Sequence, residues 1–539
     1  MTAPQTPPPS PSGGRPPQTP PPSPSGGRPP QTPPQKVVVI GGGLAGITAA
    51  IALAESGAHV TLLEARPRLG GATCSFSRDG LVVDTGQHIY LGCCAAYRGL
   101  LGKLGMTAHA PLQPRFDVTV LAPGAADSPR RARLRRTALP GPLHMLPALA
   151  RYPFLSLAER AVVSRPALAM RGLDPADPAL DEQRFGDWLA ARGQSTHARR
   201  ALWDLFSVSA LNIAGDDANL ALAATVVKTG LLGRNSAADI GVPALPLGEL
   251  HGDAAATLLS KLGARVHLAA KVAAIEVNDP AAEPGTSPHP RFLVHLARPV
   301  EPADSVDTAG AGTAKLGDEA PAESGYPAVQ LPADAVVLAV PHEAAARLVP
   351  PATLPAGTVN SWSDLGASPI VNVHVIYDRP VTDLPFAAAI DSPVQWVFDR
   401  TAISGLALNQ RAGERQQYLA ISLSAADEYV DVPAAQLRER FVPALADLFP
   451  AAREAQITEF FVTRERCATF RQAPGCNALR PKAGTRLPGL VLAGAWTGTG
   501  WPDTMEGAVR SGLAAAIELR RTDLGPEWNA STSTMGVLQ

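Results

Sequence analysis

A glycine-rich loop near the N-terminus has the residue types and the spacing to hold a phosphate group. The loop follows a β-branched run, residues 37–40, and precedes an Ala-rich stretch, residues 44–56. In such a strand, loop and helix, the first glycine makes the tight turn, the second lets a pyrophosphate approach the backbone N–H groups, and the third lets the helix pack closely on the strand. The residues expected around the pyrophosphate are Gly41, Gly43, Leu44, Ala45 and Gly46.

A carboxylate completes this pattern. Residues 58–64 predict a second strand that ends in Glu64, 23 positions after Gly41. At this spacing an acidic side chain accepts hydrogen bonds from the ribose hydroxyls of an adenosine. An acid here also argues against NADP, because an arginine would be expected to meet the additional phosphate. The sequence therefore predicts a dinucleotide site.

The composition limits the class of protein. The chain has 539 residues, 45% of them hydrophobic, which is enough for a large core and two interleaved domains. Its net charge of −1 gives no electrostatic reason to expect nucleic-acid binding. The five cysteines are an odd number without metal-ligand spacing, so we expect no metal site and a reducing cytoplasm. No apolar stretch reaches 18 residues and no signal core occurs, so neither a membrane span nor a standard export signal is expected.

Three segments are expected to lie outside the folded domains. Residues 6–18 repeat without change at 19–31 and are rich in proline, so residues 1–35 are expected to be a disordered tail. Residues 279–330 are rich in Ala, Pro and Gly and are expected to be mostly a mobile insertion. Residues 525–539 are expected to be a flexible C-terminal tail.

The residues after the ribose acid indicate which dinucleotide is bound. The sequence Glu-Ala-Arg-Pro-Arg-Leu-Gly-Gly, residues 64–71, resembles the extension found here in the flavin amine oxidase and carotenoid desaturase superfamily. The resemblance implies that the cofactor is FAD. It adds Ala65, Arg66, Gly70 and Gly71 to the cofactor-binding residues, the glycine pair because it brings backbone to phosphate.

The same resemblance places further residues around the cofactor. Residues 81–90 predict a strand that enters a glycine turn at Gly86, and in the superfamily this turn lies beside the flavin ring. Gln87 and His88 are therefore candidate catalytic residues, and the alternative interpretation of His88 is a structural histidine. Val272 belongs to a segment that resembles the one along the adenine.

A second glycine turn near the C-terminus is expected to complete the flavin site. Residues 489–496 predict a strand that ends at this turn, and residues 505–512 predict the start of a helix. A helix N-terminus aimed at the flavin O2 edge would stabilise the negative charge that reduction places there. The expected cofactor-binding residues are Gly494, Trp496, Met505, Glu506 and Ala508.

Three segments resemble one branch of the superfamily, the squalene-associated FAD-dependent desaturases, also called hydroxysqualene dehydroxylases, of bacterial hopanoid biosynthesis. These segments are residues 83–88, residues 140–149, and residues 499–508 without 503 and 504; the likeness extends over nearly all of residues 36–521. Many relatives have Asp after the glycine of the C-terminal motif, whereas this chain has Ala495. We expect from this departure at most a weaker retention of FAD.

The patterns and the resemblance together imply an α/β fold of the amine oxidase type. A Rossmann-type FAD-binding domain is expected to comprise residues 36–99, 241–345 and 463–524. It is expected to be interleaved with a substrate domain that consists of a helical cap, residues 100–240, and a second sheet with a helix, residues 346–462.

A basic cluster in the expected cap is a candidate membrane contact. Five arginines occur in residues 130–136, directly before the Leu-rich and aromatic residues 139–157. An interfacial anchor on an anionic leaflet needs basic residues beside exposed apolar ones. The alternative is a solvated basic loop ahead of core helices. We expect a cytoplasmic protein with peripheral membrane contact as an option.

For this branch the implied reaction is the reductive loss of an allylic hydroxyl from hydroxysqualene, an isoprenoid, to give squalene, with His88 as the acid for the leaving oxygen. A polyprenyl or carotenoid desaturase that uses the same hydride geometry in reverse is the main alternative. A prenyl-binding protein without redox chemistry, like the GDP-dissociation inhibitors of this fold, is another. The aromatic content of 5% weakens amine oxidation. No second dinucleotide loop occurs, so the electron donor is external and unidentified.

Overall fold

The computed structural model describes residues 35–125, 128–141, 143–278, 290–297, 329–351, 353–354, 357–408 and 415–523. These residues belong to one unit that begins at Gln35. The expectations for the proline-rich tail, for most of the insertion 279–330 and for residues 525–539 concern segments outside the described residues.

A five-stranded parallel sheet with the order β19-β13-β1-β2-β9 forms the centre of the first domain. Successive residues of β1 face opposite sides of the sheet. Val37 and Val39 join the hydrophobic cluster of helices α1 and α16, whereas Val38 and Ile40 join the cluster of the small sheet β10-β11-β12. The expected Rossmann-type sheet is therefore confirmed. The bounds are β1 Lys36–Ile40, β2 His59–Leu63, β9 Arg265–His267, β13 Ala335–Leu338, β19 Leu490–Leu492, α1 Leu44–Glu55, α16 Met505–Asp523, β10 Val272–Val277, β11 Phe292–Leu296 and β12 Gln330–Ala333.

A seven-stranded mixed sheet, with the order β18-β14-β17-β16-β15-β6-β7, forms the second domain. Its strand β14 is buried along most of its length. Val373 faces helix α14, whereas Ile376 belongs to a cluster with Val83 of β4. Strand β4 ends beside the predicted turn at Gly86, so this packing positions the turn. The bounds are β6 Asp117–Ala122, β7 Arg130–Arg135, β14 Ser368–Tyr377, β15 Phe386–Ala389, β16 Trp396–Asp399, β17 Gln417–Leu423, β18 Ile457–Thr469, α14 Ala434–Leu448, β3 Ser75–Arg78 and β4 Leu81–Asp84.

Residues 100–240 are not purely helical, and this corrects the expectation for the cap. Strands β6 and β7 pair with each other, and β6 also pairs with β15, so both belong to the seven-stranded sheet. The basic cluster is thus an edge strand rather than a loop. Ala132 and Leu134 are buried while the arginines between them are exposed, which is the two-residue period of a strand. Charged side chains on an edge strand also discourage pairing with other chains.

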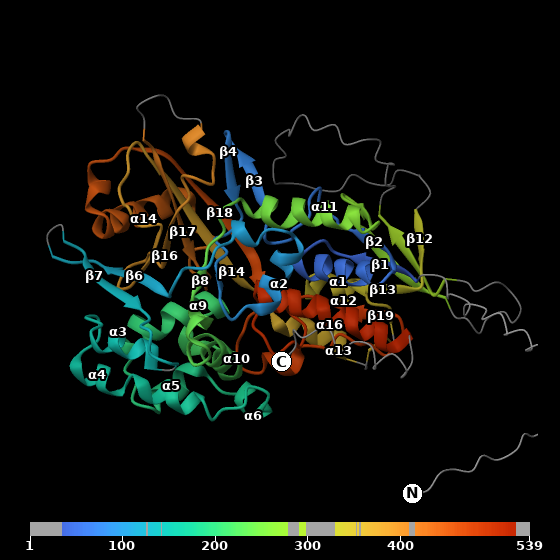
Figure 1. Ribbon diagram of the computed structural model, residues 1–539, viewed down its shortest axis with the longest axis horizontal. Coiled ribbons are helices and arrows are strands. Elements are labelled where there is room, and N and C mark those ends of the chain that lie inside the picture. The colour runs from blue at the N-terminus through green and yellow to red at the C-terminus, as the bar shows by residue number, and fades with distance from the viewer. Residues whose placement is uncertain are drawn as a thin grey trace, which may run out of the picture. The chain divides into compact units, whose positions relative to one another are not determined.

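Short helices make up the rest of the cap, at the lower left of Figure 1, while the parallel sheet lies at the right. Among the described helices, none combines the length and the apolar character that crossing a bilayer requires. The cap helices are α3 Leu146–Ala150, α4 Leu157–Val162, α5 Ser164–Met170, α6 Pro178–Asp181, α7 Phe185–Ala190, α8 Thr196–Ala198, α9 Asp204–Leu211 and α10 Leu220–Val226. The remaining elements named in Figure 1 are α2 Ala95–Lys103, α11 Ala254–Lys261, α12 His342–Leu348, α13 Thr358–Ser361 and β8 Ile240–Gly241, and α15 spans Cys476–Leu479.

Candidate active site

Two glycines of the N-terminal loop are required by packing. Gly41 has a φ of +107°, and a Cβ there would lie 2.3 Å from the carbonyl oxygen of Ala339. A Cβ on Gly46 would lie 1.9 Å from the carbonyl oxygen of Gly41. A side chain at either position would therefore clash with backbone, as the close approach of β1, α1 and β13 requires.

Gly43 is different, because the space before it is open. A Cβ there would have only the Cα of Gly71 within reach, at 3.8 Å. Gly43 stands at the N-cap of α1 and offers no side-chain cap to the helix N–H groups. The N–H of Gly70 donates to the carbonyl oxygen of Gly42 over 2.9 Å, which brings the second glycine pair to the same place. Leu44 and Ala45 begin the helix behind this opening.

Glu64 is buried next to the loop, at the end of β2. Its Oε2 accepts from the N–H of Gly42 over 2.6 Å, and its Oε1 accepts from the N–H of Arg66 over 2.8 Å. A carboxylate has about four acceptor positions, so two remain for ribose hydroxyls. The carbonyl oxygen of Glu64 accepts from the N–H of Ala270, which places the following strand, with Val272, beside it. Ala65, next along the chain, is exposed.

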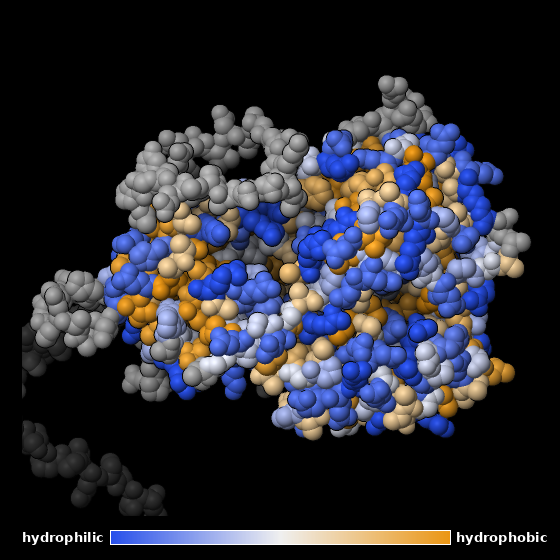
Figure 2. All heavy atoms as spheres, turned by 180° about the vertical axis from the view of Figure 1, so that it is seen from behind, coloured by the Kyte–Doolittle hydropathy of each residue, from blue (hydrophilic) through white to orange (hydrophobic). Residues whose placement is uncertain are grey.

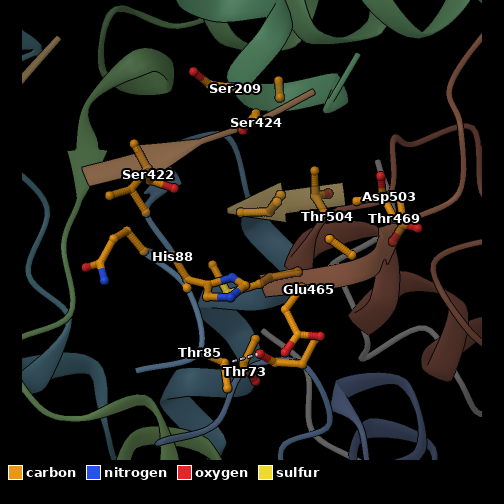
Figure 3. Close-up of a pocket in the computed structure, with 18 of the residues that line it drawn as sticks. Thr73, Thr85, His88, Ser209, Ser422, Ser424, Glu465, Thr469, Asp503 and Thr504 are labelled. Atoms are coloured by element: carbon orange, nitrogen blue, oxygen red, sulfur yellow. Dashed lines mark hydrogen bonds between the residues drawn. The ribbon is translucent and has the colours of Figure 1, made fainter. Parts of the chain in front are cut away.

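A cavity of about 270 Å³ lies between the glycine loop, the turn at Gly86 and the seven-stranded sheet (Figure 3). Seven of the sequence-predicted site residues line it: Leu44, Gly70, Gly86, Gln87, His88, Met505 and Ala508. The lining residues that were not predicted are Ala72, Thr73, Thr85, Ile89, Ser209, Ala210, Ile370, Trp396, Phe398, Ser422, Ser424, Glu465, Ala468, Thr469, Asp503 and Thr504.

A buried ion pair holds the turn that carries Gln87 and His88. The Arg400 guanidinium donates to Asp84, whose other oxygen accepts from the N–H of Leu247 over 3.0 Å. The His88 ring folds back over Gly86, and among the described residues it has no hydrogen-bond partner. Burial lowers the pKa of His88, against the opposing charge of Asp84, so the imidazole is neutral at pH 7.

The C-terminal turn is organised by one arginine that sequence reasoning missed. The Arg480 guanidinium donates to the carbonyl oxygens of Ala495, Trp496, Thr497 and Trp501, over 2.7 to 3.3 Å. Four carbonyl groups of the turn thus share one side chain. No local pattern marked Arg480, because its partners lie 15 or more positions further along the chain.

Two residues predicted at this turn have side chains with structural roles. The indole N–H of Trp496 donates to the carbonyl oxygen of Val340 over 2.9 Å. The N–H of Gly494 donates to Ser511 Oγ, also over 2.9 Å. The buried Glu506 carboxylate accepts from the N–H groups of Ala96 and Tyr97 over 3.1 and 2.7 Å, and so caps helix α2. Neither side chain lines the cavity, so any flavin contact at these residues is made by the backbone.

Comparison with known proteins identifies the family. A model described as "Flavin containing amine oxidoreductase" matches residues 44–519. The chain belongs to this family. It is an FAD-dependent oxidoreductase.

Curated relatives of this chain include two hydroxysqualene dehydroxylases, which confirms the resemblance seen in the sequence. The protein from Rhodopseudomonas palustris is 30% identical over 490 residues, 89% of this chain and 97% of the relative. The protein from Sinorhizobium fredii is 28% identical, with the same two coverages of 89% and 97%. A zeta-carotene desaturase from Zea mays is 25% identical, with coverages of 88% and 82%.

Solved structures show the same fold. A double mutant of putrescine oxidase aligns with a TM-score of 0.61 at 18% identity, over 90% of this chain and 98% of its own. An oxidoreductase from Methanosarcina mazei aligns with a TM-score of 0.63 at 16% identity, over 89% and 100%. These likenesses extend over both domains.

The residues around the cavity and the glycine loop fit FAD. The opening before Gly43 has the room that a pyrophosphate needs, next to the uncapped N-terminus of α1. In the cavity, Gln87 Oε1 is buried without a partner among the described residues, and it can accept from a flavin N–H. Glu64 keeps two acceptor positions free, which suits the ribose hydroxyls of a dinucleotide. A bound dinucleotide would give Gln87 a hydrogen-bond donor at the flavin end, and its pyrophosphate would fill the opening before Gly43.

Two cavity carboxyl groups were not found in the sequence. Burial raises the pKa of Glu465, against the opposing charges of Arg66 and Arg68. Burial also raises the pKa of Asp503, to about 6. In Figure 3, Glu465 lies towards Thr73 and Thr85, whereas Asp503 lies on another side of the cavity with Thr469 and Thr504. Asp503 could have been found from its position in the C-terminal motif, because it lies between residues 499–502 and 505–508, which carry the family resemblance.

Proposed function

We propose that this protein reductively removes the allylic hydroxyl of hydroxysqualene to give squalene. The observation that carries the proposal is the similarity to two hydroxysqualene dehydroxylases over 89% of the chain. The cavity is compatible with such a substrate: its lining combines hydrocarbon and aromatic side chains with hydroxyl groups, and its carboxyl groups can supply a proton. A desaturase acting on a carotenoid-like polyene is the second candidate, because carotenoid desaturases are similar to this chain at 23 to 25% identity.

The chemistry divides between cofactor and chain. Bound FAD, when reduced, supplies a hydride to the carbon that loses oxygen. The chain must bind the isoprenoid, exclude water, and provide a proton, because hydroxide is a poor leaving group. His88 is not suited to supply that proton in the free enzyme, because its lowered pKa leaves the ring neutral at pH 7. We assign His88 and Gln87 the roles of neutral groups that position the reactants.

An apolar groove of about 160 Å³ in the cap offers a path for the hydrocarbon. Leu143, Leu146 and Leu168 line it and remain 39 to 55% exposed at its rim. Phe206 of α9 lines the groove, and Ser209 and Ala210, one turn further along α9, line the catalytic cavity. One helix therefore borders both spaces, which supports delivery of an isoprenoid chain past the cap.

The rim of this groove is the surface we propose for peripheral membrane contact. Five of the nine large hydrophobic residues that are exposed, among the described positions, lie between residues 139 and 168. Figure 2 shows the cap from behind, at the lower right, with single hydrophobic side chains set among hydrophilic ones. Such a mixed surface suits the interface between headgroups and hydrocarbon.

The basic cluster contributes less to this surface than its sequence suggests. Asp117 pairs with Arg133 and Arg135, at 2.5 and 3.2 Å. Arg130 pairs with Asp391, and Arg136 with the buried Asp239. Arg131 alone of the five has no acidic partner among the described residues. We therefore propose that the exposed leucines, with Arg131, make the contact.

A single-turnover experiment tests the proposed reaction. Holoenzyme reduced in deuterated buffer, so that the reduced flavin carries deuterium at N5, is mixed anaerobically with hydroxysqualene, and the products are analysed by mass spectrometry. The expected product is squalene with deuterium at the carbon that bore oxygen, or at its allylic partner. Unlabelled squalene would contradict hydride transfer. Formation of a more unsaturated polyene by the oxidised enzyme, without squalene formation, would favour the desaturase.

A further inference from the structure

Asp503, a carboxyl group of the cavity, is fixed by hydrogen bonds, but only one of its two carboxyl oxygens has a hydrogen-bond partner among the described residues. Asp503 Oδ2 accepts from the N–H of Phe470 over 3.0 Å, and the Asp503 N–H donates to Gln472 Oε1 over 3.0 Å. Its Oδ1 has no hydrogen-bond partner among the described residues. Since the side chain lines the cavity, this free oxygen is available to a substrate (Figure 3).

Within the described part of the chain, Asp503 forms no ion pair. The nearest effective cation is Arg480, but its guanidinium is committed to carbonyl oxygens and to Asn477 Oδ1, and it makes no ion pair with Asp503. On the other packed elements, Arg471 pairs with Asp427, and Arg510 pairs with Glu506. Helix α10, whose Thr225 donates to the carbonyl oxygen of Gly500, carries no ionisable side chain.

These surroundings favour the protonated carboxyl. Burial raises the pKa of Asp503 to about 6, with the Phe470 N–H and the charge of Arg480 opposing the shift. An ordinary aspartate, with a pKa of about 4, would hold a proton at pH 7 roughly a hundred times less often than a group titrating near 6 does. Asp503 therefore combines a reachable oxygen with a proton that can be given and regained near neutral pH.

The other ionisable groups of the cavity are less suited. His88 is neutral, as described above, and its N–H is a weak acid. Glu465 lies on β18 in the field of Arg66 and Arg68, which oppose its protonation, and in Figure 3 it lies towards Thr73 and Thr85 rather than towards Asp503. The two carboxyl groups thus occupy different sides of one cavity.

We propose that Asp503 is the catalytic acid that protonates the departing hydroxyl oxygen of the allylic alcohol. The carbon–oxygen bond breaks with its electron pair passing to oxygen, the Asp503 proton bonds to that oxygen, and water leaves. Two electrons and one hydrogen reach the carbon as the hydride from reduced FAD, and the Asp503 carboxylate regains a proton from solvent. This inference rests on the proposed function.

The test uses Asp503→Asn in the holoenzyme and compares it with Glu465→Gln, the same change at the other carboxyl group of the cavity. The amide oxygen of Asn can still accept from the Phe470 N–H, so shape and flavin content should be kept. The single-turnover rate should fall by about 10²–10⁴-fold in Asp503→Asn, the usual effect of losing a general acid, and by less than about tenfold in Glu465→Gln. The wild-type rate should decline as pH rises above about 6, and Asp503→Asn should lose this dependence.

Two further measurements keep the proposal falsifiable if Asp503→Asn folds poorly. In Asp503→Ala, formic acid should restore part of the rate, because a small acid can occupy the vacated space. Infrared difference spectra should show a protonated carboxyl band that titrates near pH 6 in the wild type and is absent from either variant. A normal rate in Asp503→Asn, or a loss of rate without a change in the pH profile, would overturn Asp503 as the acid and leave the proposed function intact. Wild-type enzyme that forms no squalene would instead overturn the proposed function and the acid with it.

Discussion

The Arg480 guanidinium donates a hydrogen bond of 3.0 Å to the carbonyl oxygen of Ala495. Ala495 is the residue at which the C-terminal motif departs from the pattern expected from the resemblance, and its backbone is fixed by this contact without help from its side chain. The same guanidinium packs over the Phe470 ring, 5.0 Å from its centroid. The turn therefore keeps its shape through backbone carbonyls, which explains how Ala can occupy the position.

Replacement of Arg480 should destabilise this turn and weaken FAD binding. Lysine keeps the charge but cannot span four carbonyl oxygens, so Arg480→Lys should lower the free energy of unfolding by roughly 2–4 kcal/mol. Chemical denaturation and titration of apoprotein with FAD measure the two effects. Arg471→Lys is the control, because the exposed ion pair with Asp427 should contribute no more than about 1 kcal/mol. Equal effects of the two substitutions would contradict the role of Arg480.

Gly43 and Gly46 should respond oppositely to a methyl group. Gly43→Ala meets only the Cα of Gly71 at 3.8 Å, so the protein should fold yet lose its yellow colour, because the methyl occupies phosphate space. Gly46→Ala places its Cβ 1.9 Å from the carbonyl oxygen of Gly41, so it should unfold or aggregate. Flavin absorbance and circular dichroism separate these outcomes. Stoichiometric FAD in folded Gly43→Ala would remove the loop from the pyrophosphate site.

The sequence predicted the strand, loop and helix of the N-terminal unit, but not the contacts of Asp503, and the difference has a physical reason. Gly41, Gly43, Gly46 and Glu64 lie within one strand-helix-strand unit, so their spacing alone indicates their geometry. Asp503 depends on Phe470, 33 positions away, and this contact exists only in the folded chain. The periodic patterns of helices and strands extend over a few residues, so they cannot predict a contact between residues 33 positions apart.

The strand β7 was missed for another reason. Its two-residue period is present in Ala132 and Leu134, but arginines fill all the other positions, and the cluster was interpreted by charge. The ion pairs with Asp117, 16 positions from Arg133, and with Asp239, 103 positions from Arg136, show that these arginines face protein carboxylates as well as solvent. A cluster of arginines predicts negatively charged partners. Only the folded structure shows whether those partners are carboxylates of the same protein or groups of another molecule.

His88→Ala should slow the reaction only moderately, by less than about tenfold, and leave the pH profile unchanged. The reason is that a neutral imidazole can position reactants through hydrogen bonds but holds no readily released proton at pH 7. Single-turnover rates from pH 5 to 9 and the flavin content check this, with His88→Gln as the variant that retains a hydrogen-bonding side chain. A loss of 10²-fold or more with intact flavin would restore His88 as the acid.

Asp503 should make stability depend on pH. Its folded pKa of about 6 exceeds the unfolded value of about 4, so the folded state binds more protons in this window. Stability contributed by the protonated carboxyl is therefore present below about pH 4 and is lost as pH rises through 6. At pH 7.5 Asp503→Asn should be more stable than wild type by up to about 2–3 kcal/mol, and at pH 4 the difference should vanish. Denaturation curves showing a difference that is independent of pH would refute this linkage.

The exposed leucines of the cap should govern binding to membranes. Leu157 is 80% exposed and Leu168 is 55% exposed, so replacing both by Gln removes apolar surface without opening a core. Binding of the double variant to vesicles with anionic lipid should fall by about tenfold or more, because each leucine that leaves the interface loses roughly 1 kcal/mol. Leu268→Gln, an exposed leucine outside the cap at 41%, is the matched control and should bind normally.

Arg131→Gln should reduce vesicle binding further at low salt only, whereas Arg136→Gln should lower the stability of the protein, because it leaves the buried Asp239 without its ion-pair partner. Vesicle cosedimentation that ignores the cap leucines and responds equally to Leu268→Gln would place the contact elsewhere on the molecule.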